Sequence, residues 1–166
     1  MRIRCRWAVA LLVAGAAAAA SAAQVGQGTN ELNASGAVTV KGSGGDSTTT
    51  TVVGVGLGHF VSNTLELGGD FSLLKGGGGV AFGAANLRLS LHFPKTDSTA
   101  LPYVGVTVGR SYGLSDNEYM YGVYGGVKLF VSDGAALSVQ PFITRATADF
   151  GNATSLGIVS GVSLFF

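Results

Sequence analysis

Cysteine, charge and long apolar runs are all scarce in this chain. The single cysteine, Cys5, lies inside an N-terminal segment and not at its end, which excludes a lipid attachment site and a structural thiol. Beyond residue 23, no apolar run is long enough to form a membrane helix. Without Arg2, Arg4 and Arg6 of that segment, seven basic residues (ten less three) face nine acidic ones. This balance excludes a basic footprint for nucleic acid.

The N-terminal segment has the three parts of an export signal. Its three arginines form a basic region, an apolar run extends from residue 7 to 20, and the small residues at 21–23 suit a signal peptidase. We therefore predict a signal peptide over residues 1–23, cleaved near Ala23. The remaining 143 residues (166 less 23) fit one domain, over residues 24–166.

Apolar and polar residues alternate with period two in stretch after stretch of the remaining chain, which is the signature of β-strands. Each stretch is at least as long as the about 9 to 11 tilted residues that cross a bilayer as a strand. We predict an all-β fold, an eight-stranded antiparallel up-and-down transmembrane β-barrel. The predicted strands cover residues 30–41, 48–61, 64–74, 80–93, 101–111, 119–131, 135–148 and 154–166.

The two faces of each predicted strand differ in chemistry. In the fourth strand, Leu87 and Leu89 alternate with Asn86, Arg88 and Ser90. A soluble barrel places its large apolar residues inside, whereas here the charged residues share a phase with glycines that relieve crowding. The large aliphatic side chains are therefore predicted to face lipid. Eight strands then leave an interior about wide enough to be filled by side chains.

The hairpin connections are predicted to alternate between the two sides of the membrane. Chain ends in the periplasm place the connections after residues 61, 93 and 131 on that side. Two of these carry similar sequences, FVSN and FVSD, in which Ser with Asn or Asp supplies a tight turn. The outer connections are short, which limits what they can grip; they lie near residues 42–47, 75–79, 112–118 and 149–153.

Four segments carry a resemblance to a known family: GHFVSNTLELGGDFSL at 58–73, LPYVGVTVGRSYG at 101–113, YGVYGGVKLFVSD at 121–133 and the closing GVSLFF. With them, the chain resembles the outer-membrane protein β-barrel domain family, the small OmpA-like and OmpX-like eight-stranded barrels. The resemblance implies a bacterial outer-membrane location, contact with outer-membrane lipid, and Phe166 as the signal that the barrel-assembly machinery recognises. Short outer loops and the lack of a peptidoglycan-binding domain after the barrel depart from better-known members. Neither adhesion nor wall anchoring is therefore carried over.

Four charged residues are predicted to form a network in the lumen, because a buried charge is costly unless it is paired. If the hairpin between the third and fourth strands turns about Gly77, Glu66 lies directly opposite Arg88, with Asp70 one layer above and Lys128 within reach. The resemblance also implies a salt-bridged interior. The network has two interpretations: a gate that opens when ion pairs exchange, or a satisfied core that specifies strand register. The small ring favours the core.

Aromatic residues are predicted at both rims of the barrel. Tyr119 and Tyr121 are interpreted as part of an outer aromatic girdle. An aromatic floor is predicted on the inward phase near the periplasmic end, which argues against an open aqueous pore, although glycine-rich neighbours leave room for a narrow water path. The floor consists of Phe60, Tyr103, Phe130 and Phe165.

Other motifs are weak candidates for chemistry. His59 with Ser62 and Asn63 straddles a predicted turn and lacks a carboxylate to orient the imidazole, so a hydrolytic site is not favoured. The glycine run at 76–79 lacks the helix and the lysine of a phosphate-binding loop. His59 and His92 lie near opposite faces of the wall without ligand spacing, so no metal site is predicted.

These observations favour a monomeric structural or surface-interaction barrel with a mostly filled lumen and without enzymatic activity or cofactor. Two other functions stay open. A narrow conduit for small or hydrophobic solutes predicts a conductance that changes when Glu66 or Arg88 is neutralised. A lipid-modifying outer-membrane enzyme predicts an altered lipid A profile when the protein is deleted or overproduced.

Overall fold

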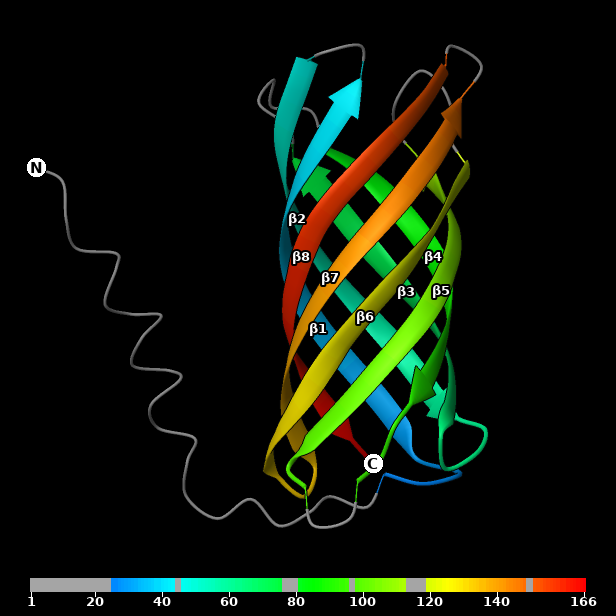
Figure 1. The fold of residues 1–166 in the computed structure, drawn as a ribbon, viewed down its shortest axis with the longest axis vertical. Helices are drawn as coiled ribbons and strands as arrows, with labels where there is room; N and C mark the ends of the chain where they lie inside the picture. Colours follow the sequence, from blue (N-terminus) through cyan, green and yellow to red (C-terminus); the bar gives the residue numbers. More distant parts are fainter. Residues whose placement is uncertain (1–24, 44–45, 76–80, 96–97, 113–118, 149–150) are drawn as a thin grey trace, which may run out of the picture.

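The strands form one closed antiparallel barrel in the computed structural model, which describes residues 25–43, 46–75, 81–95, 98–112, 119–148 and 151–166 (Figure 1). Each strand pairs with its neighbours in sequence, and β1 pairs with β8 to close the ring. The predicted eight-stranded fold is confirmed. The predicted signal peptide, with Cys5, lies outside the described residues. The strands are β1 (Asn30–Ser43), β2 (Asp46–Phe60), β3 (Leu65–Lys75), β4 (Ala81–His92), β5 (Ala100–Tyr112), β6 (Tyr119–Ser132), β7 (Ala135–Ala148) and β8 (Gly151–Phe165).

The C-terminus and the connections after β2, β4 and β6 lie at one end of the barrel, which we call the lower end (Figure 1). Backbone hydrogen bonds fasten the terminal segments there, since Asn30 N donates to Phe166 O at 2.8 Å and Gly28 N donates to Phe60 O at 2.8 Å. β1, β3, β5 and β7 end at the opposite end of the barrel, which we call the upper end, and the residues that connect them to the next strands lie outside the described part of the chain.

The side chains are sorted inside out compared with a soluble barrel. Leu57, Leu87 and Leu156 on the outer surface are 61%, 65% and 62% exposed, whereas Glu66 and Lys128 in the lumen are 2% and 4% exposed. Such a belt of aliphatic side chains suits hydrocarbon, and closure leaves no backbone edge unpaired in lipid. The described residues contain no helix long and apolar enough to cross a membrane.

The predicted register of the β3–β4 hairpin is wrong by two residues. Glu66 lies opposite Ser90, and Arg88 lies opposite Gly68, so the numbers of paired residues sum to 156 and not to 154, as a turn about Gly77 requires. A shift of two residues keeps every side chain on its face, because strand side chains alternate with period two. The position opposite glycine gives the guanidinium space: a Cβ atom on Gly68 would lie 3.4 Å from Arg88 Nη2.

Candidate functional site in the lumen

A buried lysine joins two glutamates near the lower end of the lumen. Lys128 Nζ on β6 donates to Glu31 Oε2 on β1, and lies 3.3 Å from Glu66 Oε2 on β3. Ser163 Oγ on β8 donates to the second oxygen of Glu31 at 2.6 Å. Glu31 is 1% exposed and Ser163 is fully buried. Four strands that are scattered along the sequence are thereby tied across the interior.

His92 completes this layer at the end of β4. Its Nε2 lies 2.7 Å from Glu66 Oε2, and its ring packs 4.8 Å from the ring of Phe60 and 5.3 Å from that of Tyr103. Its other ring nitrogen is buried without a hydrogen-bond partner among the described residues. Nε2 faces the carboxylate, so the proton on this nitrogen is the one that Glu66 accepts. Glu66 therefore accepts hydrogen bonds from a lysine and a histidine.

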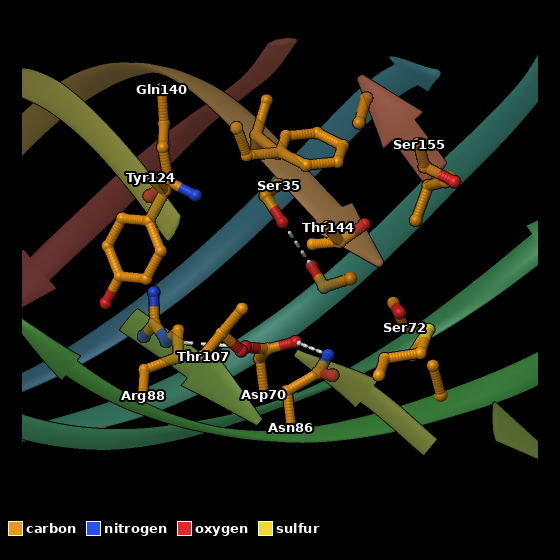
Figure 2. A pocket seen from close by; sticks show the side chains of 17 residues that line it. Ser35, Asp70, Ser72, Asn86, Arg88, Thr107, Tyr124, Gln140, Thr144 and Ser155 are labelled. Carbon is orange, nitrogen blue, oxygen red and sulfur yellow. Dashed lines mark hydrogen bonds and ion pairs between the residues drawn. The ribbon is translucent and has the colours of Figure 1, made fainter. Parts of the chain in front are cut away.

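A second charged layer lies above the first, on β3 and β4. Arg88 Nε lies 3.3 Å from Asp70 Oδ2, and Asn86 Nδ2 donates to Asp70 Oδ1 at 2.8 Å (Figure 2). Arg88 Nη2 lies 4.0 Å from Glu66 Oε1, which links the two layers. Apart from His92, the named groups carry three negative and two positive charges. The cluster is close to electrically balanced, as a buried set of charges must be.

Aromatic side chains close the lumen beneath the charges. Phe60 is fully buried, and Tyr103 and Phe130 are each 5% exposed. Phe130 packs on Phe165 with ring centroids 5.2 Å apart, and Lys128 Nζ lies 5.2 Å from the centroid of Tyr103 and 5.5 Å from that of Phe165. Cation–π attraction adds to the ion pairs in holding the ammonium group. The four aromatic residues predicted as a floor lie inside the barrel near its lower end.

Two cavities occupy the lumen above this floor. The larger, of about 180 Å³, is lined by hydroxyl and amide side chains that include Ser35, Thr107, Gln140 and Thr144 (Figure 2). The smaller, of about 80 Å³, lies against the charged residues Glu31, Glu66 and Lys128. Arg88 and Asp70 line both cavities. Both cavities have room for ordered water, and the Arg88–Asp70 pair lies where they adjoin.

The sequence prediction missed two members of the lower layer. The four predicted network residues lie in the lumen and are joined by the contacts above, but Glu31 and His92 belong with them. Glu31 stands on the polar phase of β1 with Asn33 and Ser35, and His92 stands on the phase of Arg88 and Ser90. Strand phase alone would have assigned both residues to the lumen.

The weak candidates lie away from this site. His59 is exposed and its Nδ1 lies 2.9 Å from Asn30 Oδ1, while Ser62 Oγ accepts hydrogen bonds from the backbone of Thr64 and Leu65 in the turn. Among the described residues, no three His, Cys, Asp or Glu side chains are placed to hold a metal ion. Tyr119 and Tyr121 are exposed near the upper end, and Phe166 is 71% exposed at the lower end. Residues 76–79 lie outside the described residues.

Solved structures with the same fold are small outer-membrane barrels. Neisserial surface protein A matches with a TM-score of 0.70 at 19% identity, over 83% of this chain and 99% of that one. The N-terminal β-barrel domain of Pseudomonas aeruginosa OprF matches with a TM-score of 0.60 at 16% identity, over 86% and 100%. The outer membrane protein OprG from the same organism matches with 0.58 at 12% identity, over 88% and 99%. No family model and no curated protein matches the sequence.

Proposed function

We propose that this chain is a non-enzymatic barrel of the bacterial outer membrane, with a structural or surface-contact role and a closed lumen. The observation that carries the proposal is the double seal at the lower end. The Lys128–Glu31–Glu66–His92 layer lies directly on the aromatic floor, and its members are nearly devoid of solvent exposure. A hydrated ion that entered here would meet a buried, paired set of charges. To pass, it would have to separate these pairs and leave buried charges unpaired. The lower end corresponds to the periplasmic side, since the start of β1, the C-terminus and three connections lie there.

The arrangement of the described histidines supports the absence of hydrolytic chemistry. His59 is bonded to an asparagine at an exposed turn, and His92 is sealed between Glu66, Phe60 and Tyr103. An imidazole that neither lipid nor water reaches has no substrate to activate. An unchanged lipid A profile after deletion and after overproduction is the expected result. A lipid A profile that changes on deletion, and that the native protein restores but a folded variant without the activity does not, would instead show that the protein is an enzyme.

Planar bilayer recording on the folded protein tests the closed lumen. We expect a flat trace, without unitary steps, over a range of potentials. Folding is verified in the same sample by the heat-dependent shift in gel mobility. Discrete openings of the native protein would contradict the proposal.

A narrow conduit is the second candidate, and the two cavities above the floor favour it. Together they continue from the upper half of the lumen down to Lys128, so the lower layer and the floor are the barrier that remains. If the barrel conducts, Glu66→Gln and Arg88→Gln are expected to change the unitary conductance, because they alter the charges that line the path. A flat trace from the folded native protein would remove this candidate.

A further inference from the structure

Two arginines stand on the lipid-facing surface near the upper end. On that surface, every other strand side chain that the structure describes is uncharged, and most are aliphatic. Arg110 on β5 lies opposite Tyr119 on β6, and Arg145 on β7 lies opposite Tyr121 on β6. Both arginine side chains point outward. Thr107 on β5 and Thr144 on β7 line the lumenal cavity, and a residue an odd number of positions away lies on the other face of the same strand. One strand thus separates two outward cations on the same rim.

These arginines have no anionic partner among the described residues. The guanidinium of Arg110 lies 5.1 Å from the ring centroid of Tyr119, and its Nε is buried without a hydrogen-bond partner in the described structure. Arg145 is exposed. A charge on a lipid-facing strand is costly unless it reaches the interface and finds a counter-charge. Tyr119 and Tyr121, 59% and 48% exposed, mark this level as the interface.

An apolar hollow opens on the same outer surface beneath Arg145. Small side chains account for the hollow: Gly36 on β1 lies opposite Ser160 on β8, so that two small residues meet on the lipid-facing side. Val38, Val53, Leu156 and Ile158 stand around it. Leu156 is paired with Ile143, the residue two positions below Arg145 on the same face of β7. The hollow therefore begins one layer below Arg145, a cation without an anionic partner among the described residues.

We propose that Arg110, Arg145 and this hollow form a binding site for a phosphorylated membrane lipid of the outer leaflet. The guanidinium groups bind the headgroup phosphate. Each guanidinium is a planar array of donors that can bind two phosphate oxygens at once. One acyl chain lies in the hollow over Gly36 and Ser160. Neither part alone identifies the occupant, but a cation at interface height directly above an apolar groove matches the layout of an anionic lipid. The upper end faces the outer leaflet, because the start of β1 and the C-terminus lie at the other end.

Native mass spectrometry of protein purified from membranes in a non-ionic detergent tests this site. The probe is lipid A with two phosphates, compared with its dephosphorylated form and with phosphatidylcholine. We expect selective retention of the phosphorylated lipid, weakened about fivefold by Arg145→Gln and further by the double variant with Arg110→Gln, at about fivefold per basic residue. Arg145→Lys keeps the charge and is expected to retain most of the binding. Lys95→Gln, at an exposed position of the lower end, is the matched control and is expected to have no effect.

The acyl part of the proposal has its own matched pair. A Cβ atom on Gly36 would make only an ordinary contact, 3.9 Å from the nearest backbone oxygen, and the rest of a leucine side chain there would extend over the hollow. Gly125 also faces lipid, and a Cβ atom there would meet neighbours at an ordinary 3.5 Å. We expect Gly36→Leu to weaken binding of lipid A and Gly125→Leu to leave it unchanged, with both variants folded by gel mobility. Equal weakening by both would overturn the acyl site.

Three further results would overturn the headgroup site. One is unchanged binding in the double arginine variant, as expected if acidic residues of the outer connections already neutralise the arginines. Another is equal retention of the phosphorylated and dephosphorylated lipids. The third is displacement of lipid A by millimolar inorganic phosphate, which would identify a site for free anions. Conductance of the native protein bears on the proposed closed lumen alone and leaves this test unaffected.

Discussion

Replacing Lys128 with methionine is the sharpest test of the buried layer. Methionine keeps nearly the length of the lysine side chain but removes the charge, which leaves Glu31 and Glu66 without their shared ammonium partner. Both carboxylates are at least 98% buried, so they are not open to bulk water in its absence. Removing one partner of a buried ion pair costs about 3 to 5 kcal/mol. We expect Lys128→Met to lower the free energy of unfolding by an amount in that range.

Denaturant unfolding of the barrel in lipid vesicles measures this change. Far-UV circular dichroism and gel mobility are suitable probes, because the only tryptophan, Trp7, lies in the predicted signal peptide. Lys95→Met at the exposed lower connection is the control and is expected to change stability by less than about 0.5 kcal/mol. Adding Glu31→Gln to Lys128→Met is expected to restore part of the loss. A Lys128→Met barrel as stable as the native one would refute the reasoning, and so would strictly additive losses in the double variant.

Three other substitutions test neighbouring contacts in the same unfolding assay. Arg88→Met is expected to destabilise more than the double change Arg88→Met with Asp70→Asn, since the single change strands a partly buried carboxylate; equal losses would mean that the pair does not interact. Gly58→Ala is expected to cost about 1 to 3 kcal/mol, because the added carbon would collide with the carboxylate of Glu66, whereas the added carbon of Gly36→Ala makes only an ordinary contact at 3.9 Å and is the control. Tyr103→Phe loses a 3.0 Å hydrogen bond to a glutamine on β7 and is expected to cost about 1 kcal/mol; an unchanged midpoint would show that this bond contributes nothing.

The sequence predicts the barrel well because its physics is local. Period-two alternation is imposed residue by residue by the difference between lipid and lumen, so strand positions and faces follow from short windows. Lys128 illustrates this point. It stands between Val127 and Leu129, and this alternation alone places its side chain inside. The resemblance to small outer-membrane barrels then added the closed ring, which structures with the same fold support.

Register and long-range partners are not local, and the sequence prediction failed there. The glycine run between β3 and β4 has no residue that marks the centre of the turn, so the sequence does not decide which residue of β4 lies opposite Glu66. The structure instead aligns Arg88 with Gly68, where space is available. The pair of Glu31 and Lys128 is separated by 97 residues, and only closure of β1 against β8 brings the two together. A window of one strand contains no trace of that contact.

The two interpretations of the buried charges can be separated with the same variants. If the lower layer is a core that specifies register, the double variant Lys128→Met with Glu31→Gln remains closed, because its side chains still fill the space above the aromatic floor. If the layer is a gate, the barrier depends on the ion pairs themselves, so their removal changes conduction even where stability is restored. Recording from that variant therefore distinguishes packing from charge. A flat trace supports the core, whereas unitary openings absent from the native barrel would assign the seal to the ion pairs.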